Sequence, residues 1–143
     1  MIDIENKIVD AVFNAVKAPD AYPDADVTTG FDMKTAVFPC VVIEEVNNAP
    51  LRSTDTDDCA ENYTRLVYEI SVYTDNLNKA KSEGRKILDI VDDTLQGLKF
   101  RRVRTNQPLH ISRSVFRQYA RWEVVVGKPI IDGDRVIYQM YRR

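Results

Sequence analysis

Cysteine, histidine and glycine are all scarce in this chain. Its 143 residues include two cysteines, one histidine and five glycines. Two cysteines exclude a disulfide-rich scaffold, and one histidine excludes HExxH zinc sites and most zinc fingers. The glycines form neither GxGxxG nor GxxxxGKS/T, so these phosphate-binding loops are missing. Most familiar enzyme classes are therefore not expected.

Long apolar segments are missing as well. The first 17 residues, MIDIENKIVDAVFNAVK, carry acidic side chains from Asp3 onward and no apolar core of signal-peptide length. No segment approaches the roughly 20 apolar residues of a membrane span. We therefore expect a cytoplasmic protein with reduced thiols, in which Cys40 is a small buried hydrophobic residue and Cys59 is also reduced.

The length and composition are those of one globular domain. Hydrophobic residues make up 44% of the chain and charged residues 29%. A chain of this length buries about two-thirds of its unfolded surface, so it needs neither metal nor disulfide to fold. We predict a single domain over residues 1–143.

The net charge of −2 hides a strong asymmetry. Residues 1–97 hold 19 acids and 9 bases, a net charge of −10, whereas residues 98–143 hold 3 acids and 11 bases, a net charge of +8. The basic part suits contact with nucleic acid. It equally suits contact with the acidic part of a second copy, as in a head-to-tail ring. A solvated surface without a partner is the third interpretation.

Two segments have helical periodicity. Apolar residues follow one face over residues 3–17, with Asp3 as N-cap and Pro19 as the stop. A second face runs over residues 77–98, where Thr74, Asp75 and Asn76 offer caps and Gly97 is a natural C′ residue.

The strands predicted from the sequence are residues 37–46, 63–73, 100–104 and 115–126. Residues 27–31 are expected to form either a short strand or an irregular segment. Residues 47–62 are predicted to form a long polar loop. Asp132-Gly133 is a hairpin-type dipeptide that joins residues 129–131 to residues 135–141. The predicted fold is α+β: an antiparallel or mixed sheet of about four strands, two helices packed on one face, and a C-terminal hairpin or arm over residues 127–143.

None of the charged clusters has the pattern of a catalytic or metal site. The acidic cluster at residues 55–61 lacks the central glycine of a calcium loop and a final glutamate at the correct position. Glu44 and Glu45 are consecutive on a strand and point to opposite faces. His110 stands alone, without a serine elbow. No catalytic residue, metal or cofactor is expected.

The candidate residues are instead those of an interface with another subunit or partner. Arginine is favoured at protein interfaces and pairs with carboxylates in two-point contacts. The candidates are Arg101, Arg102, Arg104, Arg113, Arg117, Asp55, Asp57, Asp58, Glu61, Tyr138 and Tyr141.

The order of these elements resembles the tail terminator (tail completion) proteins of long-tailed bacteriophages and prophages. The resemblance covers nearly the whole chain. It is carried by the opening helix IENKIVDAVFNAVK, the pair PCVVIEEVNN and YTRLVYEISVYTDN around a polar loop, the helix KAKSEGRKILDIVDDTLQGLKFRR leading into a basic strand, and the ending FRQYARWEVVV…IYQMYRR. The segment GKPIIDGDRV is longer than the short turn of that family.

The resemblance implies a structural virion protein of the tail and neck, assembled in the host cytoplasm. Such a protein forms an oligomeric ring of about six copies at the head-proximal end of the tail tube. The ring ends tube polymerisation and later joins the head-completion (neck) protein, while DNA passes through its lumen without being read. It implies no enzyme activity, no cofactor and no membrane contact.

Three alternatives remain at this point. The first is a sibling role as a head–tail connector or stopper of the neck. The second is a small nucleic-acid-binding protein that uses the basic segment 99–121. The third is an enzyme whose site is built from aspartate and glutamate alone, which would need a close pair of buried carboxylates in a cleft.

Overall fold

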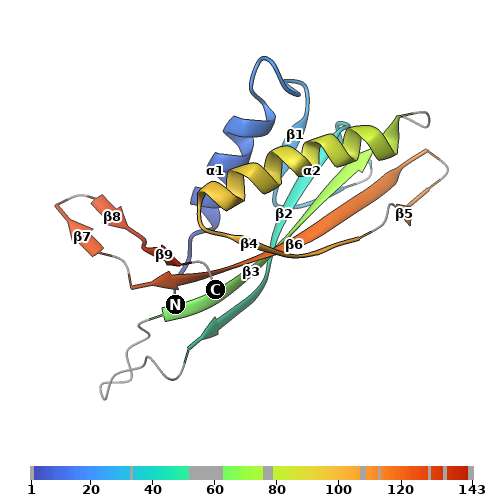
Figure 1. Ribbon diagram of the computed structural model, residues 1–143. Coiled ribbons are helices and arrows are strands. Elements are labelled where there is room, and N and C mark those ends of the chain that lie inside the picture. Colours follow the sequence, from blue (N-terminus) through green and yellow to red (C-terminus); the bar gives the residue numbers. More distant parts are fainter. Residues whose placement is uncertain are drawn as a thin grey trace.

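The protein has an α+β fold, and its described residues form two helices and a mixed sheet (Figure 1). The computed structural model describes residues 2–32, 34–51, 63–75, 79–106, 109–112, 114–128, 130–133 and 135–141. Its elements are α1 (Glu5–Val16), β1 (Asp26–Thr28), β2 (Cys40–Pro50), β3 (Tyr63–Thr74), α2 (Ala80–Gly97), β4 (Arg101–Thr105), β5 (Leu109–His110), β6 (Phe116–Gly127), β7 (Ile130–Asp132), β8 (Arg135–Ile137) and β9 (Met140–Tyr141).

Seven of the described strands form one sheet in the order β1-β2-β3-β6-β4, with β5 and β9 also paired to β6. The β1–β2 pair is parallel and the other pairs are antiparallel. The predicted number of about four strands was therefore too low. Strand β1 lies near the segment expected at residues 27–31. Strands β5 and β9 have only two residues each, too few to produce a period-two pattern in the sequence.

Strand β6 has different neighbours on its two sides. Along one side it pairs with β3 from Phe116 to Gly127. Along the other side, three short strands follow one another: β5 beside residues 116–117, β4 beside residues 120–123 and β9 beside residues 125–126. The basic last third of the chain thus builds this whole edge of the sheet.

Both helices lie on the same face of the sheet, as predicted (Figure 1). The alternation of β3 places Leu66, Tyr68, Ile70 and Val72 toward the helices, where all four are buried. Trp122 of β6 is fully buried in the same layer, and its indole Nε1 donates a hydrogen bond of 2.8 Å to Asp92 of α2. Burying such large side chains contributes about 1.5–3 kcal/mol each.

Two element boundaries differ from the prediction. Strand β2 continues to Pro50, so residues 47–50 belong to a strand and not to the polar loop. A bulge between Glu45 and Asn47 shifts the alternation, which hides the continuation in the sequence pattern. Helix α2 begins at Ala80, and the predicted cap Thr74 is the last residue of β3. The predicted N-cap Asp3 was one residue too early, because the N-cap of α1 is Ile4. The Oδ1 of Asp3 accepts a 3.0 Å bond from the amide of Glu5, the first residue of the helix.

The end of α2 also differs from the prediction. Gly97 is the last helical residue, and Lys99 adopts the left-handed conformation with φ of 72°. The amide of Phe100 bonds to the carbonyl of Leu95, and the amide of Lys99 bonds to that of Gln96. These two bonds form a Schellman motif in which lysine occupies the position that glycine usually takes.

Candidate interaction surface

The face of the sheet opposite the helices is polar, yet much of it is closed to solvent. Odd-numbered residues of β3 and β6 point to this helix-free face, because alternate residues of a strand face opposite sides. Glu69, Ser71 and Glu123 are all buried there, each at most 8% exposed. Buried carboxylates must be paired, so the arginines of this face are part of its structure.

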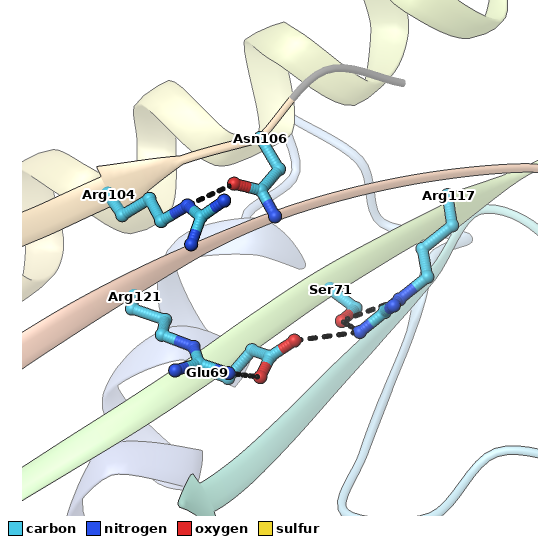
Figure 2. Close-up of polar contacts among 6 residues, drawn as sticks. All are labelled: Glu69, Ser71, Arg104, Asn106, Arg117 and Arg121. Carbon is cyan, nitrogen blue, oxygen red and sulfur yellow. Dashed lines mark hydrogen bonds and ion pairs between the residues drawn. The ribbon is translucent and has the colours of Figure 1, made fainter. Parts of the chain in front are cut away.

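Glu69 of β3 lies at the centre of this face (Figure 2). Its Oε1 accepts a 2.8 Å bond from Nη2 of Arg117, and its Oε2 accepts a 3.2 Å bond from Nη2 of Arg121. Arg117 also reaches Oγ of Ser71, at 3.2 Å from its Nε. One carboxylate thereby fixes two arginines of the neighbouring strand, and the guanidinium of Arg117 lies 4.2 Å from the ring centre of Tyr119.

A second ion pair lies one step along the same face. Nε and Nη2 of Arg65 both bond to Oε2 of Glu123, at 3.0 and 2.6 Å. This pair joins β3 to β6, as the Glu69 network does. Together they fix three arginines with two carboxylates, so the helix-free face keeps a positive excess at its centre.

A single row of the helix-free face crosses four strands. In the register of the sheet, Glu44 of β2 lies opposite Glu69 of β3, Glu69 opposite Arg121 of β6, and Arg121 opposite Arg104 of β4. Directly opposite residues share a face, with Cβ atoms about 4.5–5.5 Å apart. The row therefore reads acid, acid, base, base from one edge to the other; its two outer members, Glu44 and Arg104, are exposed.

The structure divides the predicted interface arginines between two faces. Arg101 and Arg104 lie opposite residues of the helix-free face, and Nε of Arg104 donates a 2.8 Å bond to Asn106 (Figure 2). Arg102 points to the helix side, where its Nη1 lies 3.3 Å from Asp92. Arg117 joins the first group through Glu69. Residues 101–104 therefore do not form a single basic patch, because Arg102 faces the opposite side of the sheet from Arg101 and Arg104.

The predicted tyrosines lie near the end of the same edge. Tyr138 is partly buried against the core, and Tyr141 of β9 contacts the ring of Tyr63 edge-on at 5.8 Å. The remaining candidates fall outside the described residues: they are Arg113, Asp55, Asp57, Asp58 and Glu61.

Three other side chains with potentially reactive groups, those of His110, Cys40 and Tyr68, contact neighbouring residues of the protein. The ring of His110 contacts that of Phe116 in a tilted arrangement, with ring centres 4.0 Å apart. Cys40 is buried, as predicted, and burial together with the carboxylate of Asp26 raises the pKa of its thiol to about 11. Burial, and then the hydrogen-bonded carboxylate of Glu45, raises the pKa of Tyr68 well above its ordinary value.

Metal-binding groups and membrane-spanning helices were also sought. Within the described ranges, no group of three or more histidine, cysteine, aspartate or glutamate side chains is arranged to hold a metal ion. No helix in those ranges is long and apolar enough to cross a membrane.

Several residues of this surface were not among the sequence candidates. Glu69, Glu123, Arg65 and Arg121 form ion pairs with each other or with Arg117, and none of these four residues was an interface candidate from the sequence. The available signal was the period-two alternation of charges on residues 65–69 and 117–123. This alternation could not show which strands are neighbours in the sheet, and the ion pairs form only between side chains of neighbouring strands.

No protein family model and no curated protein sequence matches this chain.

Proposed function

We propose that this protein is a structural component of a long-tailed phage or phage-like particle that forms a ring at the head-proximal end of the tail tube. There it ends tube polymerisation and provides the docking surface for the neck. The proposal rests on the resemblance of the sequence to tail terminators and on one observation of the structure. Acidic residues lie at one edge of the sheet and arginines at the opposite edge.

That arrangement favours association of identical subunits in one direction. A contact between two different surfaces of the same chain generates a ring if its rotation closes, and an open filament otherwise. Opposite charges on the two surfaces also suppress symmetric pairing, since like-charged contacts are unfavourable. In this proposal the subunit's partners are further copies, the tail tube protein and a head-completion protein, while DNA passes through the lumen unread.

The C-terminal segment is part of the same proposal. Strands β7 and β8 pair only with each other in the described chain and form a separate hairpin around Gly133. In Figure 1 this hairpin stands beside the end of β6, away from α2. We assign it the role of an arm toward the tube or the neck.

The test uses tail tubes assembled from the purified tail tube protein of a long-tailed phage. Added to growing tubes, the protein should stop elongation and appear by electron microscopy as a ring on one end only. Tubes that grow to the same length and keep bare ends at all protein concentrations would refute the proposal. Binding to the portal side alone would instead indicate the neck connector role.

A second candidate function is nucleic-acid binding. It is favoured by the gathering of Arg101, Arg104, Arg117 and Arg121 on one face of the sheet. It predicts an affinity for DNA that falls steeply between 50 and 200 mM salt, because phosphate contacts release counterions. Fluorescence anisotropy with a labelled duplex measures this directly, and Arg104→Glu should remove it.

A further inference from the structure

We infer that the exposed edge of β4 pairs with the exposed edge of β2 in a second copy of this chain, and that Arg104 and Glu44 meet across this contact. The inference deepens the proposed ring and rests on it for the direction of assembly. It names the two strands and the two side chains that join neighbouring subunits.

Both edges are open in the described chain. No described strand pairs with β4 on the side away from β6, and all five of its residues are exposed. On β2 the short strand β1 covers only residues 40–42, and residues 44–47 are all exposed. Exposed strand edges of this kind present unpaired amides and carbonyls to any suitable strand.

The strand directions are compatible with the contact. Strands β2 and β6 run the same way, because each is antiparallel to β3, and β4 runs against both. A rotation that keeps the strand direction brings the next copy's β2 alongside β4 in antiparallel orientation. The sheet would then continue from one subunit into the next.

The charges of the two edges are complementary at one row. Within one subunit, Glu44 lies opposite Glu69 and Arg104 lies opposite Arg121, so each edge ends in a pair of like charges. Like charges directly opposite each other are unfavourable. Joining β4 to the next β2 places Arg104 beside Glu44 and completes a repeating row of acid, acid, base, base.

Apolar side chains accompany these charges. A bulge in each edge strand presents an exposed valine: Val103 on β4 is 53% exposed and Val46 on β2 is 39% exposed. Bulges and arginines on an edge also occur in monomeric proteins as protection against aggregation. Charges of either sign would suffice for protection alone. Here the two edges carry opposite charges, acidic on β2 and basic on β4, and Glu44 and Arg104 lie in the same row of the sheet.

The experiment is a charge exchange between the two edges. The variants are Glu44→Arg, Arg104→Glu and the double variant. The control is Lys86→Glu on the exposed face of α2, which changes the net charge by the same amount as Arg104→Glu. Each single edge variant removes a like-charge pair inside the subunit, so all should fold, which circular dichroism checks. Assembly is measured by light scattering and sedimentation up to about 1 mM protein and on tail tubes.

The inference predicts assembly of the wild type and the Lys86→Glu control, and association at least about tenfold weaker for each single edge variant. The double variant should recover assembly. A one-to-one mixture of the two single variants should recover it too, because each supplies the edge that the other needs. Hydrogen exchange at residues 101–105 and 43–50 should slow on assembly.

Several outcomes overturn the inference. Single variants that assemble like the wild type, or a double variant that does not recover, exclude this contact. Capping of tubes by Arg104→Glu would exclude it while leaving the proposed function standing. Recovery by the double variant together with uncapped tubes would refute the proposed function alone. Protection of β4 by DNA, lost in Arg104→Glu but kept in Glu44→Arg, would assign the edge to nucleic acid. A wild type that neither associates in solution nor forms a ring on tail tubes overturns both proposals.

Discussion

Gln118 of β6 fits directly against Gly84 of α2. Its amide Nε2 lies 2.5 Å from the place that a Cβ would occupy at residue 84, and it donates a 3.0 Å bond to the carbonyl of Lys81. Glycine is therefore needed at this position for the helix to approach the sheet closely enough for a buried glutamine to reach its backbone.

Gly84→Ala is expected to destabilise the protein by about 1 kcal/mol. Displacing the buried amide costs about 1–3 kcal/mol, and the better helix propensity of alanine returns about 1 kcal/mol. In a Gln118→Ala background the obstruction is gone, so the same change should stabilise by about 0.5–1 kcal/mol. Urea unfolding of the four proteins of this cycle measures both values; an equal effect in the two backgrounds would contradict the contact.

Lys99→Gly is expected to stabilise the protein by about 1 kcal/mol. A left-handed conformation costs a residue with a side chain about 1–2 kcal/mol, and the greater conformational entropy of glycine in the unfolded chain offsets part of this gain.

Gly97→Ala should also stabilise, by about 0.5–1 kcal/mol, since residue 97 is helical and a Cβ there meets no atom within 4 Å. Thermal unfolding distinguishes this from the sequence-based assignment of Gly97 as the left-handed residue, under which Gly97→Ala would destabilise.

The two arginines that share Glu69 should differ in their contribution. Arg117→Ala removes a side chain that is 24% exposed and also bonds to Ser71, and it should cost about 1–3 kcal/mol. Arg121→Ala removes a side chain that is 45% exposed and should cost about 0–1 kcal/mol. Denaturant titrations at low and high salt give the order, and the reverse order would show that the network is not centred on Arg117.

The raised pKa of the Cys40 thiol predicts how the stability of the protein changes at alkaline pH. Its pKa rises from 9.0 to about 11 on folding, so its contribution is complete below pH 9 and is lost as the pH rises toward 11. The raised pKa of Tyr68 acts in the same direction.

In a Cys59→Ser background, the thiol of Cys40 should react slowly with a disulfide reagent at pH 8 and rapidly after unfolding. Fast reaction in the folded protein would show that Cys40 is accessible.

The long elements of the fold were predictable because their side-chain periods extend over many residues. The alternation from Leu66 to Val72 and the helical face of α2 both identify the buried side correctly. Three features escaped prediction for local reasons. The bulge after Glu45 reverses the alternation, the left-handed residue is a lysine where glycine is usual, and β5 and β9 are two residues long.

The candidate surface was predictable only in part. Arginine type and the charge asymmetry of the chain predicted the interface candidates Arg101, Arg102, Arg104, Arg113 and Arg117, but not Arg121. Their division between two faces depends on the pairing of β4 with β6 and on the bulge between Arg102 and Arg104. The partnership of Glu69 with Arg117 and Arg121 joins residues about fifty positions apart, and no local pattern contains it.

The pairing of β3 with β6 has a consequence for how the chain folds. Its register joins Thr74 to Phe116 at the near end and Tyr63 to Gly127 at the far end, with α2 and β4 in the intervening chain. Closing such a loop costs entropy before the contacts form, so the central pair cannot form early by local collapse. Helix α2 is local and is expected to form within about a microsecond, whereas the central sheet requires two distant segments to meet. We therefore expect the encounter of β3 with β6 to limit the folding rate.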